Sequence, residues 1–258
     1  LSVAVFGGLS VGPIIGEFVM GDVAESARGL NAGHFNAVFV VTAGAAVLAA
    51  LVSLTAPAFV GERPARIRRK VSWFHKRSLL PGAILAVGMA AWTAFTSFVP
   101  TFSKSIGLSG SAQFFALYSI LCLFLRLFGA KTPERIGLHR SVVMAMSFLL
   151  CGVTSVAVLG NEFGIWLGTI FFALGVSFFY PSLLAMAVEG SDENERVEIV
   201  SSFTSFFEIG GVMGGLALGL VGELFGERST FVGGMVFASL GLLLLARTRQ
   251  QSSPTIAV

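Results

Sequence analysis

The feature that most constrains this chain is a basic stretch between two uncharged apolar runs. Glu62–Arg77 carries seven of the chain's 17 Lys and Arg residues and a single acid. Neither Phe35–Leu54 before it nor Leu79–Phe102 after it contains a charged residue. An apolar run of about 20 residues is long enough to cross a bilayer as a helix, and basic connections stay on the cytoplasmic side. The pattern predicts two membrane helices joined by a cytoplasmic loop.

The rest of the chain has the same character. It is 55% hydrophobic and 12% charged, which is too apolar for a soluble domain and excludes a nucleic-acid-binding reading of the basic stretch. No alternation typical of a barrel is present, so helices are predicted. The eight expected spans are Leu1–Met20, Phe35–Leu54, Leu79–Phe102, Ala112–Ala130, Ser141–Leu159, Phe163–Val188, Ile199–Val221 and Phe231–Ala246.

The charges of the connections fix a predicted orientation. With Glu62–Arg77 inside, the inside connections and tail hold 14 Lys and Arg residues. The outside connections hold three, namely Arg28, Lys104 and Arg228. This asymmetry predicts a multi-pass protein of the cell inner (plasma) membrane with both ends cytoplasmic.

The first apolar run contains the motif GGLSVGPIIGE. Its glycines recur every four residues and would line one helix face, where a neighbouring backbone can approach, and its proline would bend the helix. The residues are Gly8, Gly12, Pro13 and Gly16. A simple packing seam is the alternative to a functional motif. Gly211, Gly215 and Gly219 repeat the spacing in the seventh run, which is typical of a transporter with two related halves.

These motifs resemble those of the major facilitator superfamily. GGLSVGPIIGE resembles the Gly-Pro motif in the fifth helix of its antiporters, and RLFGAKTPERIGLHR resembles its cytoplasmic motif after the eighth helix. FFYPSLLAMAVEGSDENER and FFEIGG resemble its tenth and eleventh helices. Ala130 replaces the usual Gly and Glu134 the usual Asp, so we expect weakened rather than lost gating contacts. Leu1 begins inside an apolar run, so the family's first four helices are expected to be missing.

The resemblance implies an all-α polytopic membrane protein with eight transmembrane helices. Residues 1–60 would be the last two helices of the N-terminal transporter domain, and residues 61–78 the cytoplasmic inter-domain loop. Residues 79–247 would form the six-helix C-terminal bundle, and residues 248–258 a cytoplasmic tail.

Glu208 is the only acid in the middle of an apolar run. A carboxylate in hydrocarbon is costly, so it is expected to face a cavity or a partner and to act as a proton-coupling group. The alternative is a structural hydrogen bond within the bundle.

Arg126 lies at the inner end of the fourth run, where its side chain is expected to snorkel to the interface. With the motif residues it could form a cytoplasmic lock that breaks when the two halves rock. These residues are Glu134, Arg135, Gly137 and Arg140. The alternative is a positive-inside anchor without a gating role.

Polar and aromatic residues gather in the third, fourth, sixth and seventh runs. They predict an apolar, aromatic substrate cavity, although membrane aromatics are more often lipid-facing bulk. The candidates are Trp92, Thr96, Gln113, Tyr118, Phe179, Tyr180 and Phe207.

The resemblance and these residues together predict a proton-coupled transporter that exports a small hydrophobic solute by alternating access. A proton symporter importing a metabolite and a non-transporting membrane fragment or scaffold are the alternatives. The expected partners are the bilayer, protons, a small-molecule substrate and the four missing helices. The sequence offers no catalytic constellation and no metal-ligand spacing, so no enzyme activity and no cofactor are predicted.

Overall fold

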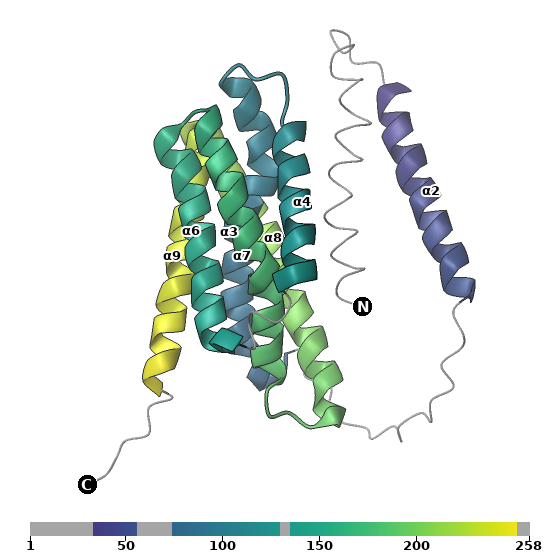
Figure 1. The fold of residues 1–258 in the computed structure, drawn as a ribbon, viewed down its shortest axis with the longest axis vertical. Coiled ribbons are helices and arrows are strands. Elements are labelled where there is room, and N and C mark those ends of the chain that lie inside the picture. The colour runs from purple at the N-terminus through teal and green to yellow at the C-terminus, as the bar shows by residue number, and fades with distance from the viewer. Residues whose placement is uncertain (1–32, 56–73, 130–134, 252–258) are drawn as a thin grey trace.

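The computed structural model describes residues 33–55, 74–129 and 135–251, and all the regular structure in these ranges is helical (Figure 1). The seven described helices are α2 (Gly33–Thr55), α3 (Lys76–Ser105), α4 (Ala112–Gly129), α6 (Leu138–Leu159), α7 (Glu162–Val188), α8 (Glu193–Phe225) and α9 (Arg228–Gln251). Six of them, α3 to α9, are long and apolar enough to cross a membrane. The all-α, polytopic class predicted from the sequence is confirmed. Leu1–Met20, with Gly8, Gly12, Pro13 and Gly16, lies outside the described residues.

The six membrane-length helices form one bundle, in which α3 packs against α6, α7, α8 and α9 (Figure 1). Within the same bundle, α6 packs against α7 and α9, and α4 packs against α7. The core between them is rich in large rings, and Phe95, Phe114 and Phe172 are fully buried. By contrast, the side chains of α2 from Phe39 to Val52 are all exposed.

Two side chains show which helix ends lie together. The guanidinium of Arg77, in the first turn of α3, donates to the carbonyl of Gly190 between α7 and α8 at 2.7 Å. At the other end of the bundle, Arg228 of α9 donates to the last carbonyls of α6. Its Nε contacts Ala157 O and its Nη2 contacts Val158 O, each at 2.6 Å. Connections therefore alternate between two ends, as the assignment of inside and outside loops requires. The orientation across a membrane stays a prediction.

The residue after α6, Gly160, is held under Arg228. It adopts a left-handed conformation with φ 60°, which glycine reaches without a steric cost. A Cβ built on Gly160 would lie 2.7 Å from Arg228 Cζ. The backbone conformation therefore favours glycine here, and a side chain at this position would also require the Arg228 guanidinium to shift.

Several helices extend beyond their apolar runs. The largest difference is in α8, which begins at Glu193, six residues before the predicted Ile199, and ends at Phe225. Glu193 and Glu195 occupy its first turn, where negative side chains interact favourably with the helix dipole. Apolar content marks only the part of a helix that suits hydrocarbon, so it misses charged turns of this kind.

The contact between α3 and α8 is built from small residues. A Cβ on Gly210 would overlap the backbone of Ala86, and a Cβ on Gly214 would lie 2.5 Å from Ala90 Cα. One turn earlier, the ring of Phe206 occupies the space over Gly82. The paired residue numbers rise together, so the two helices run in the same direction.

The glycines singled out by their spacing are not the ones at this contact. A Cβ on Gly211 would meet no atom within 4 Å, and those on Gly215 and Gly219 would have only ordinary contacts at 3.9 Å. The close approach of the α3 and α8 backbones lies one residue earlier, at Gly210 and Gly214. Small residues at four-residue spacing allow such an approach in membrane helices.

Candidate functional site

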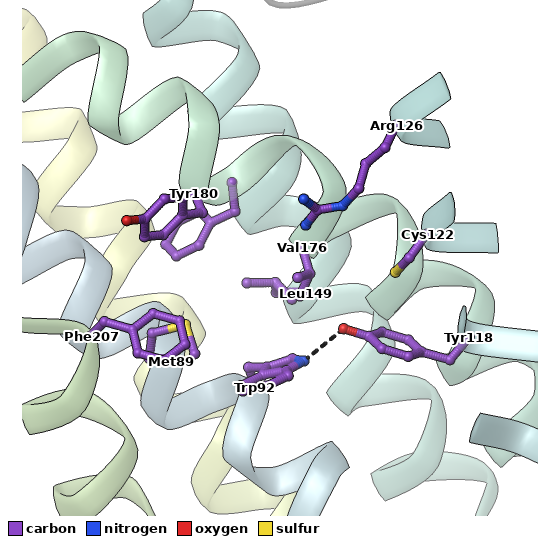
Figure 2. A pocket seen from close by; sticks show the side chains of 10 residues that line it. Met89, Trp92, Tyr118, Cys122, Arg126, Leu149, Val176, Tyr180 and Phe207 are labelled. Atoms are coloured by element: carbon purple, nitrogen blue, oxygen red, sulfur yellow. Dashed lines mark hydrogen bonds between the residues drawn. The ribbon is translucent and has the colours of Figure 1, made fainter. Parts of the chain in front are cut away.

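A small pocket lies where α3, α4, α6, α7 and α8 converge (Figure 2). It is lined by Met89, Trp92, Tyr118, Cys122, Arg126, Leu149, Val176, Phe179, Tyr180 and Phe207. Its free space measures about 30 Å³. A water molecule needs about 10–15 Å³ on this measure, so the pocket in this conformation has room for about two or three waters and for no organic solute.

One wall of the pocket is a hydrogen-bonded pair of aromatic side chains. Trp92 of α3 donates from its Nε1 to the hydroxyl of Tyr118 of α4 at 3.1 Å (Figure 2). The Tyr118 ring is almost completely buried and packs on Phe95, with 5.5 Å between ring centroids. A buried indole or phenol usually needs such a polar partner. The pair therefore joins α3 to α4 at the pocket without leaving either polar group unsatisfied.

The opposite wall is a cluster of rings from α7 and α8. Tyr180 contacts Phe207 edge-on with ring centroids 6.1 Å apart, and contacts Phe203 at 5.5 Å. Phe207 also reaches across to Trp92, at 6.4 Å. The chain of ring contacts runs from α7 through α8 to α3, so movement of any of these helices would change the shape of the pocket.

Glycine on α3 makes room for a further ring. Phe179 is buried, and its ring occupies the space that a Cβ on Gly88 would need. Any larger residue at position 88 would displace Phe179 from the pocket wall.

Arg126 is the charged residue that lines the pocket. It is half-buried, and its guanidinium points from α4 toward the space between Tyr180 and Val176 (Figure 2). Tyr118, Cys122 and Arg126 are spaced by four residues and lie on one face, so Arg126 shares the direction of the buried Tyr118 and Cys122. The expected snorkelling of Arg126 to the membrane interface stays a prediction.

The remaining residues of the expected cytoplasmic lock lie away from the pocket. Arg135, Gly137 and Arg140 are exposed, and none lines the pocket. Glu134 and Ala130 lie outside the described residues. The lock stays a prediction.

Glu208 is exposed on the surface of α8. It follows Phe207 in the chain but is not itself a lining residue. Its proton-coupling role stays a prediction.

Of the seven cavity candidates, the structure brings together five: Trp92, Tyr118, Phe179, Tyr180 and Phe207. Thr96 is not among the lining residues, and its hydroxyl donates to the carbonyl of Trp92 at 3.4 Å, one turn back in α3. Gln113 is exposed near the start of α4.

Apart from Arg126, which was assigned to the cytoplasmic lock, four lining residues had not been singled out: Met89, Cys122, Leu149 and Val176. Helical spacing was the signal that could have found three of them. Met89 precedes Trp92 by three residues, Cys122 follows Tyr118 by four, and Val176 precedes Tyr180 by four. Leu149 had no such signal, because it is an aliphatic residue in an aliphatic run.

Comparison with known proteins decides the family. A family model described as Major Facilitator Superfamily matches residues 1–215. The chain belongs to the major facilitator superfamily. No solved structure gave a significant match to this superfamily member.

Curated relatives agree with this family. This superfamily member is 24% identical over 222 residues to the uncharacterized MFS-type transporter YhhS of Escherichia coli, a match that covers 85% of the chain and 54% of the relative. The protein of the same name from Salmonella enteritidis is 24% identical over 207 residues, covering 79% and 48%. The chain spans about half the length of the curated relatives it matches.

Proposed function

We propose that this major facilitator superfamily protein is a secondary active transporter that exports a small, largely hydrophobic solute in exchange for protons. The observation that carries the proposal is the aromatic pocket between α3, α4, α7 and α8. Ligand sites are typically lined by apolar and aromatic side chains with a few placed polar groups, and Trp92, Tyr118 and Arg126 are polar groups of this kind.

Alternating access would give the pocket its function. With a free volume of about 30 Å³, the pocket in this conformation is too small for a solute, so the helices around it would have to separate during transport. Rocking of one bundle against another around a central site is the usual way in which such transporters do this. We place the protein in the inner membrane with both chain ends in the cytoplasm, on the basis of the basic connections.

Glu208 is the proposed proton carrier. It lies in the middle of α8, beside the pocket residue Phe207, and ionisable groups in membrane spans usually take part in transport. Protonation of Glu208 would remove a charge from the α8 surface, and this change would favour one of the two conformations.

The test is pH-gradient-driven efflux in proteoliposomes that contain the complete protein. Two fluorescent solutes serve as probes, the neutral N-phenyl-1-naphthylamine and the anionic naphthalene-2-acetate. Efflux of either should depend on the gradient in the parent protein and should disappear in Glu208→Gln. Glu223→Gln is the matched control, because Glu223 is an exposed acid near the end of the same helix, and it should transport normally.

Absence of gradient-driven efflux of both probes in a folded parent protein would overturn the proposed export. Undiminished gradient-driven efflux in Glu208→Gln would remove Glu208 from the mechanism.

A further inference from the structure

The charge of the pocket constrains what it can bind. Arg126 is the one charged residue among the ten that line it, and none of the ten is an acid. The other nine provide rings, aliphatic groups, two hydroxyls, a thiol and a thioether. The pocket thus combines an apolar surface with a single positive group, and this combination does not suit an organic cation.

A guanidinium has a specific chemistry in such surroundings. Its planar fork of donors matches a carboxylate with two parallel hydrogen bonds, and charge-assisted bonds of this kind are the stronger ones. A ligand carboxylate that reaches Arg126 in the pocket would form such charge-assisted bonds, whereas a neutral ligand would form weaker ones.

The aromatic side chains define the other half of the ligand. Trp92 and Phe207 lie across the pocket from Arg126, and Tyr180 lies beside it (Figure 2). An aromatic or aliphatic body could lie among these three rings while its charged end contacts the guanidinium. The guanidinium and the three rings line the same pocket, so one molecule could contact all of them once the pocket has widened.

We propose that the solute of this pocket is an amphipathic organic anion, whose carboxylate binds Arg126 and whose apolar body lies against Trp92, Tyr180 and Phe207. The proposal deepens the proposed export function and rests on it for the transport of the anion. It specifies the charge of the small hydrophobic solute expected from the sequence, and it makes Arg126 a binding residue instead of part of the expected cytoplasmic lock.

The binding experiment compares three probes of similar shape and different charge. These are naphthalene-2-acetate, naphthalene-2-acetamide and 2-(2-naphthyl)ethylammonium, titrated calorimetrically at neutral pH into the complete protein in detergent. The parent protein should bind the acetate about tenfold or more tightly than the amide, and should bind the ammonium least. This comparison needs no substitution, so it does not depend on a variant that folds.

Variants then assign the preference to one residue. Arg126→Gln should lose the preference for the acetate and keep its affinity for the amide, and Arg126→Lys should retain part of the preference, because it keeps the charge but not the fork. Arg247→Gln is the control, because Arg247 is an exposed basic residue near the end of α9 and does not line the pocket. Since each probe is compared between proteins, its partition into micelles cancels.

The outcomes separate this inference from the export proposal. Equal binding of acetate and amide by the parent, tighter binding of the ammonium, or an unchanged acetate preference in Arg126→Gln would overturn the anion site. If charge-selective binding is found but no gradient drives efflux, the anion site stands and the export proposal fails. If the gradient drives efflux of the neutral probe alone and the protein shows no preference for acetate, the export proposal stands and the anion site fails.

Discussion

The two faces of α8 carry the same residue type at the same spacing and have different surroundings. On one face, Gly210 and Gly214 lie directly against the backbone of α3. On the other, Gly211 has no neighbour within 4 Å of where a Cβ would be. Adjacent residues of a helix are turned by about 100° from each other. Four-residue glycine spacing therefore predicts a packing seam only when the rotation of the helix is also known.

The packed face of α8 is continuous over about three turns. Ser202 accepts a hydrogen bond from the backbone N–H of His75 at 2.9 Å, and Phe206, Gly210 and Gly214 follow at intervals of four residues. The outward face includes Glu208, Val212 and Met213, all exposed. The two faces thus separate the contacts that hold the bundle together from the surface where proton coupling is proposed.

The largest difference in stability between the two faces should appear when the adjacent residues Gly210 and Gly211 are each replaced by alanine. In Gly210→Ala, the new methyl group would overlap the carbonyl oxygen and Cα of Ala86, so α3 and α8 must move apart. We expect a loss of stability of about 1–3 kcal/mol, as for other overpacked cores. Thermal unfolding in detergent, followed by size-exclusion fluorescence, measures it.

Gly211→Ala is the matched control for that substitution. It adds the same methyl group to the same helix in open space, and alanine favours the helix by up to about 1 kcal/mol over glycine. It should be as stable as the parent or more stable. Equal destabilisation by the two variants would contradict the assignment of the packed face.

Gly214 and Gly215, one turn later in α8, should show the same contrast in unfolding temperature, with a smaller difference between the two variants. A methyl group at Gly214 would lie 2.5 Å from Ala90 Cα, whereas one at Gly215 would lie 3.9 Å from Thr93 Cγ2. Gly214→Ala should unfold at a lower temperature than the parent, and Gly215→Ala should not. The overlap at Gly214 is less severe than at Gly210, so the order of the two shifts tests the geometry. A reversed order would mean that α8 is tilted differently against α3.

The smallest effect on the unfolding temperature is expected at Ser202, where the packed face of α8 begins. Ser202→Ala removes the acceptor of the His75 N–H, and His75 precedes the first turn of α3. A single hydrogen bond contributes about 1 kcal/mol, so a small decrease of the unfolding temperature is predicted. Ser201→Ala, at an exposed neighbour on α8, is the control. A decrease as large in Ser201→Ala would assign the effect to helix propensity and not to the bond.

Much of the fold could be predicted because a segment that crosses the hydrocarbon core must be a helix of about 20 predominantly apolar residues. Each of the six helices from α3 to α9 contains a predicted apolar run, apart from Ala130, which falls outside the described residues. The helix ends were less predictable, since caps and charged turns such as Asp192 to Glu195 depend on local hydrogen bonding and the helix dipole.

The rotation of each helix could not be predicted. In a soluble protein the polar face of a helix identifies its outer side, but a membrane helix that is apolar all round gives no such signal. The aromatic residues of the site were found because their bulk and polar groups stand out. The direction of Arg126 and the exposed position of Glu208 follow from helix rotation, which neither charge nor apolar content reveals.

The contact of Arg228 with the end of α6 has a consequence for sequence change. Its guanidinium occupies the space beside Gly160 and holds two carbonyls of α6, so the two positions restrict each other across more than sixty residues of chain. A side chain at 160 would displace the arginine, and the freed carbonyls would then need another donor. A substitution at position 160 is therefore coupled to position 228, because the Arg228 guanidinium would have to shift and would then leave its bonds to α6.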